Sequence, residues 1–315
     1  MKREIVLSSL LEILEKKIPQ KTKLTETLMD ILFLEKGAVS RRLRGEVPFN
    51  IFELASISEK LNLPLLNLTA DKSEWVDSFT LDVTGISFKK WHEYIAFVNL
   101  AKKDPLSEFA CSTNQIPATI YAKYVSLYKF FIFKYLYLLG GTENRMTFKE
   151  FILPEELKKI YWSYYHESKF IAKSFFVCDT LMTDNLITDL RYFSGIHLLS
   201  EDELRQIKED LLSFMDYFEE IAVNGSFDET GNQVEIYISD VNLDSNYTYL
   251  QINNIRVCLV RTFNINAVMA KDNNSYEKIK NWVQSLKRSS TLISQSGAIF
   301  RAEFFEKQRK MIAEL

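Results

Sequence analysis

Residue types that bind metals or react covalently are few in this sequence and lie far apart. They are His92, His166, His197, Cys111, Cys178 and Cys258. None has a partner at a metal-ligand spacing, and an odd number of distant cysteines gives no disulfide framework. Gly-rich phosphate loops and nucleophile-elbow motifs are also missing from the sequence. We therefore expect no metal site, no cofactor, no catalysis, and a reducing, cytoplasmic environment.

A short basic run is the main remaining concentration of reactive side chains. Arg41, Arg42 and Arg44 lie within four positions, and Lys36 precedes them. A guanidinium group is a fixed fork of hydrogen-bond donors that suits anionic oxygens. Such a cluster is normally only a solvated face, so its meaning depends on the elements that hold it.

The first 70 residues predict four short helices with tight turns between them. Leu10 and Leu14 lie on the apolar face of the first helix, which Pro19 ends. Asn50 can cap the fourth helix, with Glu53 three residues later to close a capping box. The expected ranges are about 1–18, 24–33, 36–44 and 51–62.

Two spacings within these helices carry a family signature. Leu28 is followed eleven residues later by Val39, and the run from Val39 to Gly45 reads Val-Ser-Arg-Arg-Leu-Arg-Gly. Apolar residues continue downstream at Ile51, Leu54, Ile57, Leu61, Leu63 and Leu68. Without a gap, residues 24–68 resemble the phage-repressor (XRE-like) helix-turn-helix family. The resemblance implies a domain over 1–70 whose third helix enters the major groove of double-stranded DNA.

The resemblance also implies which side chains face the DNA. Lys36, Ser40 and Arg41 are expected to read bases, while Gly37 permits close backbone approach. Arg42 and Arg44 are expected to contact phosphates, as is Thr25 at the start of the second helix. Gly45 is expected to reverse the chain with a positive φ.

Two residues depart from the family pattern. Phe33 occupies the turn position usually given to Gly, which predicts a wider or less regular turn. Leu43 stands where an acidic residue is common, which predicts that the usual polar contact within the motif is lost.

The rest of the chain predicts a mainly α fold, α+β overall. Residues 66–90 predict a linker and extended segment, with the linker at 71–90 and an alternating run from Phe79 to Phe88. Residues 91–315 predict a mainly helical regulatory or dimerisation domain with a small antiparallel sheet at about 232–270. Helices are expected at 121–139, 155–176, 201–221, 275–292 and 297–313, and strands at 234–238, 247–260 and 264–270.

Several apolar stretches allow two interpretations. Residues 116–139 are long enough to span a bilayer, but Lys123, Lys129 and Lys134 favour a buried helix and no membrane. The aromatic cluster at 161–166 fits either the wall of a ligand pocket or, more simply, helix packing. Cys178 follows three apolar residues, which indicates burial rather than redox sensing. The apolar stripe along 275–313 fits a dimer contact or an intramolecular core.

The distribution of charge along the chain gives weak support to DNA binding. Residues 1–70 carry a net of +2, residues 71–270 a net of −9, and residues 271–315 a net of +4. Together with the helix-turn-helix resemblance, this predicts a sequence-specific DNA-binding transcription regulator that acts as a homodimer. We expect its C-terminal domain to serve in sensing or oligomerisation, with an unknown small-molecule or peptide effector. The alternative is a non-enzymatic interaction scaffold whose helix-turn-helix unit does not bind DNA.

Overall fold

The chain folds into two compact units, Met1–Phe79 and Thr80–Leu315. The computed structural model describes residues 2–61, 63, 88–140, 146–263 and 266–315. Most of the expected linker, including the alternating run before Phe88, lies outside the described residues, as does Leu68. Residues 88–90 already belong to a helix.

The first unit contains the four expected helices, with small shifts at their ends. They are α1 (Lys2–Lys17), α2 (Lys21–Leu32), α3 (Lys36–Leu43) and α4 (Ile51–Leu61). Their apolar faces meet in one core formed by Leu10, Leu14, Leu24, Leu28, Val39 and Ile57. The two residues of the eleven-residue spacing, Leu28 and Val39, are both fully buried.

Local sequence signals set two of the turns as predicted. The Asn50 amide donates to Glu53 Oε2 at 3.0 Å, and the Glu53 amide donates to Asn50 Oδ1 at 2.9 Å. This reciprocal capping box starts α4. Gly45 adopts a φ of +77°, a conformation that Gly reaches without steric cost.

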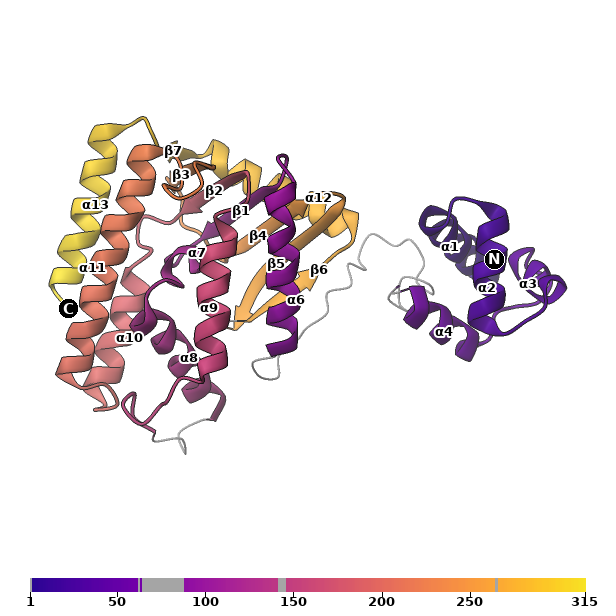
Figure 1. Cartoon of the computed structure of the whole chain (residues 1–315), viewed down its shortest axis with the longest axis horizontal. Helices are drawn as coiled ribbons and strands as arrows, with labels where there is room; N and C mark the ends of the chain where they lie inside the picture. Colours follow the sequence, from indigo (N-terminus) through magenta and orange to yellow (C-terminus); the bar gives the residue numbers. More distant parts are fainter. Residues whose placement is uncertain (1, 62, 64–87, 141–145, 264–265) are drawn as a thin grey trace. The chain divides into compact units, whose positions relative to one another are not determined.

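The second unit is built on a seven-stranded mixed sheet with helices packed on its faces (Figure 1). Its strands are β1 (Glu108–Thr113), β2 (Lys173–Cys178), β3 (Gln233–Ser239), β4 (Tyr247–Ile252), β5 (Ile255–Phe263), β6 (Asn266–Ala270) and β7 (Ser290–Leu292). The spatial order is β6-β5-β4-β1-β2-β3-β7. β1, β2 and β3 pair in parallel, and the remaining pairs are antiparallel.

The helices divide unequally between the two faces of this sheet. They are α6 (Phe88–Asn99), the 3-10 helix η1 (Leu100–Lys103), α7 (Ala118–Tyr121), α8 (Val125–Gly140), α9 (Glu155–Ser168), α10 (Asp184–Gly195), α11 (Glu201–Asn224), α12 (Asn273–Arg288) and α13 (Ala298–Ala313). One face carries the large core shared by the sheet with α6–α11 and α13. The other face is covered by α12 and has a smaller core.

The expectation of a small antiparallel sheet is wrong. The expected helix 155–176 ends at Ser168, and its last residues form β2. β1 and β2 are buried on both faces, so they show no alternation that would distinguish a strand from a buried helix. The expected strand 247–260 is a hairpin that turns at Asn253, whose φ is +53°. The strand expected at 234–238 is confirmed.

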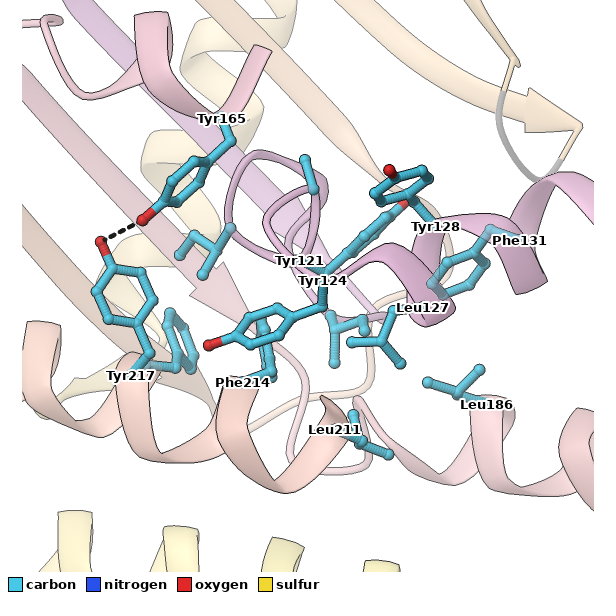
Figure 2. Packing of buried hydrophobic residues seen from close by; sticks show 14 of the residues in the cluster. Tyr121, Tyr124, Leu127, Tyr128, Phe131, Tyr165, Leu186, Leu211, Phe214 and Tyr217 are labelled. Atoms are coloured by element: carbon cyan, nitrogen blue, oxygen red, sulfur yellow. Dashed lines mark hydrogen bonds between the residues drawn. The ribbon is translucent and has the colours of Figure 1, made fainter. Parts of the chain in front are cut away.

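Aromatic packing fills the large core of the second unit (Figure 2). The Tyr165 hydroxyl donates to the Tyr217 hydroxyl at 3.2 Å, and the Tyr128 and Tyr161 rings stack at 4.6 Å. The simpler interpretation of the aromatic cluster at 161–166 is therefore confirmed, although Trp162 is exposed. Burial also raises the pKa of the Cys178 thiol, which disfavours a reactive thiolate.

The two apolar segments with open interpretations are both intramolecular. α8 is packed on most sides within the large core, and no helix among the described residues is long and apolar enough to cross a membrane. In the 275–313 stripe, Val283 is buried on the sheet and Phe305 is buried in the large core. α13 lies beside α11 (Figure 1). The buried members of the stripe therefore form intramolecular core, Trp282 is left exposed, and dimerisation stays a prediction.

The chain reversal at Gly45 predicts a contrast between two glycines. Gly45→Ala places a Cβ at positive φ and 2.5 Å from Leu7 Cδ2. We expect this change to destabilise the first unit by about 1–2 kcal/mol. Gly37 lies in α3, and a Cβ added there would meet no heavy atom within 4 Å, so Gly37→Ala should stabilise the same unit by about 0.5–1 kcal/mol.

Hydrogen exchange of the amides in α2–α4 of the full chain would measure both effects. A Gly45→Ala variant with unchanged amide protection would contradict the role assigned to the positive φ.

Candidate nucleic-acid interface

The surface of α3 is the candidate interface. The helix has eight residues, and its inner side is anchored by the fully buried Val39. Half-buried Leu43 packs against the same core, in place of the polar contact that the family pattern gives this position. Anchoring at these two positions fixes which side of the helix faces solvent.

Five of the seven predicted residues lie on the outward side of this segment. Lys36, Gly37, Arg41 and Arg44 are exposed, and Ser40 is half-buried. Their positions are linked by the three- and four-residue steps of a single helical face. The structure therefore brings together the three predicted base readers, the predicted backbone approach and one of the predicted phosphate contacts.

Thr25 is not part of this group. α2 begins at Lys21, three residues earlier than expected, and the Leu24 amide already donates to the Gln20 carbonyl at 2.9 Å. Thr25 is therefore beyond the first turn, where helix amides bond within the helix rather than to a phosphate. The physical reason for including Thr25 no longer holds.

Arg42 lies on a different side of α3 from the predicted readers. Its Nε donates to Glu53 Oε2 at 3.0 Å and its Nη2 donates to Glu53 Oε1 at 2.7 Å. The two side chains are only 15% and 12% exposed. Arg42 Nη1 also donates to the Ala38 carbonyl at 3.3 Å. Arg42 thus donates hydrogen bonds within its own unit. Its role as a phosphate contact is not tested by these contacts and stays a prediction.

Glu53 joins the start of α4 to the end of α3 through one carboxylate. It caps α4 through the Asn50 amide and holds Arg42 at the end of α3. Burial opposes ionisation of this carboxyl. The hydrogen bonds and positive charge of Arg42, together with the hydrogen bond from the Asn50 amide, outweigh burial and lower the pKa of Glu53. Sequence spacing showed the cap but gave no signal for the pairing across the turn.

Arg44 differs from Arg42 in its surroundings. Its Nε donates to Glu46 Oε1 at 2.7 Å, and the two side chains are 60% and 50% exposed. The hydrogen bond from Arg44 lowers the pKa of Glu46. A pair this exposed contributes little to stability. The Arg44 guanidinium can therefore exchange Glu46 for another anion at small cost.

Phe33 is the unusual residue of the turn between α2 and α3. It has φ +53° and ψ +42°, and its amide donates to the Met29 carbonyl. The turn nevertheless has only the three residues between Leu32 and Lys36, so the expected widening does not occur. Phe33 takes the left-handed conformation that Gly would take, and the residue is 92% exposed.

In the described part of the second unit, candidate reactive groups are few and scattered. Among the described residues, no group of His, Cys, Asp and Glu could hold a metal ion. An open cleft of about 420 Å³ lies between Lys102, Phe170 and Glu229. Two of its ionic groups are already paired, since Glu229 binds the buried Lys169 at 2.7 Å and Lys102 binds Glu167 at 2.6 Å. The geometry therefore assigns no ligand to this cleft.

The contrast between the two arginine pairs gives a stability prediction. Arg42→Met leaves the mostly buried Glu53 carboxylate without its main partner, so we expect a loss of about 1–3 kcal/mol in the first unit. Arg44→Met is the matched control and should leave stability unchanged, because both members of that pair are solvated. Hydrogen exchange of α3 and α4 in the full chain would report the difference. Equal losses in both variants would contradict the structural role of Arg42.

The lowered pKa of Glu53 also predicts a pH dependence. The stabilisation from this carboxylate is fully present above its unfolded pKa of about 4.3 and is lost as pH falls through the lower folded pKa. We expect protection factors of α3 and α4 to decline below about pH 4. The Glu53→Gln variant should lack this component of the decline. The same acid profile in both proteins would rule out Glu53 as its source.

Comparison with known proteins gives one family match. Residues 2–79 match the family model of the BetR domain, an N-terminal helix-turn-helix DNA-binding domain of the XRE-like type. No curated protein and no solved structure matches the chain. The first unit of this chain is therefore similar to BetR domains, and this similarity covers the candidate interface on α3.

Proposed function

We propose that the chain is a sequence-specific DNA-binding transcription regulator. The observation that carries this proposal is the outward side of α3, where Lys36, Ser40 and Arg41 stand on a helix anchored within a BetR-type domain. A helix of this kind fits the major groove, where each base pair presents a distinct pattern of donors and acceptors.

The polar side chains on α3 and at its end have different roles in this proposal. Arg41 binds guanine O6 and N7 through two parallel hydrogen bonds, and Lys36 and Ser40 contact neighbouring base edges. Arg44 leaves its exposed pair with Glu46 to bind a phosphate, which fixes register without reading sequence. Arg42 stays with Glu53 and acts as a positioning residue that holds α3 against α4.

Dimeric binding is the second part of the proposal. Helix-turn-helix proteins commonly bind as two-fold dimers, with half-sites about 34 Å apart. The stripe on α12 and α13 does not supply the dimer contact, because its buried members are part of the core. We place sensing or oligomerisation on other surfaces of the second unit, with a small-molecule or peptide effector of unknown identity and no catalytic step.

A protein-interaction scaffold is the alternative function. The first unit exposes Phe33, Ile51 and Phe52, and exposed apolar side chains are also found at protein interfaces. A scaffold would use these residues to bind a protein and would show no salt-dependent affinity for DNA.

Binding of the full chain to duplexes selected from a random pool separates the two functions. We expect affinity to fall steeply as salt rises, because each phosphate contact releases counterions. Arg41→Ala should cost about 1–3 kcal/mol and relax preference at one base pair. Arg44→Ala should weaken all sequences alike and reduce the slope of log affinity against log salt by about one.

Arg42→Lys serves as a control, because it keeps the charge but loses the forked contact with Glu53. It should reduce stability without changing which base pairs are preferred. If no duplex binds even at low salt, the regulator function is wrong. Identical effects of Arg41→Ala and Arg44→Ala would overturn the division into reader and anchor.

A further inference from the structure

We propose that Phe33 is a specificity-determining residue that reads thymine through its 5-methyl group. This proposal rests on the proposed DNA-binding function and extends the interface beyond α3 into the preceding turn. Phe33 was not among the residues that the family resemblance placed on DNA.

The free protein gains nothing visible from having Phe at this position. The backbone is in the left-handed region, which is strained for a residue with a bulky side chain. The residue is 92% exposed, so its ring buries little apolar surface within its own unit. Gly would relieve both costs. A strained backbone and a solvent-exposed aromatic ring at one residue indicate a role in binding something outside the unit.

The position of Phe33 restricts what it can contact. It lies three residues before Lys36, the first residue of α3. Three residues of extended chain span at most about 11 Å, close to the roughly 12 Å width of the major groove. Base contacts in this class of motif come from the start of the recognition helix. With α3 in the groove, Phe33 therefore lies within roughly three base pairs of the base that Lys36 contacts.

The chemistry of the ring selects the base. A phenyl group does not form the hydrogen bonds by which Lys36, Ser40 and Arg41 would read base edges. The thymine 5-methyl is the one apolar group that the four bases place in the major groove, and Phe is among the residues that contact it. Contact with this methyl would bury part of the exposed ring next to the polar readers of α3.

Removal of single methyl groups from the DNA tests the proposal. The full-length chain is bound to a duplex selected from a random pool, and each thymine is replaced in turn by uracil. We expect the wild-type chain to lose about fourfold in affinity at one position in each half-site, the effect of one methyl group transferred to an apolar contact. The Phe33→Gly variant should show no such loss at that position.

Two further measurements separate a lost contact from a lost fold. Phe33→Gly should raise the melting temperature of the first unit, because it relieves the left-handed strain, and should keep the wild-type salt slope. Phe33→Leu should retain part of the sensitivity to uracil. Ile299→Ala, which changes an exposed apolar side chain of the second unit, is the matched control and should behave as wild type.

Several outcomes would overturn the proposal. One is a wild-type chain that binds the selected duplex but is indifferent to uracil at every thymine. Another is a Phe33→Gly variant that keeps the wild-type sensitivity. A third is a change in sedimentation of Phe33→Gly without any change in DNA binding, which would assign the ring to a contact between copies of the chain. If the wild-type chain binds no duplex, the proposed function itself fails, and this outcome is distinct from the other three.

Discussion

The candidate interface depends on holding a helix that is too short to be stable alone. Helices below about 12–15 residues are marginal in water, and α3 has eight residues. Its side-chain contacts come from the buried Val39, the half-buried Leu43 and the ion pair between Arg42 and Glu53. Because Glu53 also caps α4, one carboxylate sets the start of one helix and the end of another. The presentation of every side chain on the outer side of α3 depends on these contacts.

The same constraint explains why three neighbouring arginines have different surroundings. A helix that packs on one side turns successive residues toward different environments. Arg42 is turned toward α4, where it binds the Glu53 carboxylate, and it also donates to the Ala38 carbonyl of its own helix. Arg41 is exposed, and Arg44 lies in a solvated pair that contributes little. A basic run in a sequence therefore overstates the number of cations available to a ligand.

The second unit is built around a sheet whose central strands are covered on both faces. Its parallel strands β1, β2 and β3 are covered on both faces, so the backbone hydrogen bonds of the sheet centre are shielded from water. The aromatic core lies on one face and the single helix α12 on the other, and within this unit Cys178 is buried and Glu229 is paired with Lys169.

Signals that act over a few residues were readable from the sequence. The four N-terminal helices, the capping box of Asn50 and Glu53 and the positive φ of Gly45 each depend on neighbours within about one turn. The burial of Leu28 and Val39 also followed from the family spacing. These features were therefore predicted with shifts of only a few residues at helix ends.

Features that join distant residues were decided by the tertiary structure. The partner of Arg42 lies eleven residues away across a turn, and β2 pairs with strands more than 50 residues from it in sequence. A strand buried on both faces has no alternating pattern, so the run Phe175–Cys178 could not be distinguished from a buried helix. The left-handed conformation of Phe33 likewise depends on how α2 and α3 pack, because the sequence preference of Phe opposes it. Local chemistry thus determined the elements of the first unit, and packing between distant residues decided which of its side chains remain exposed.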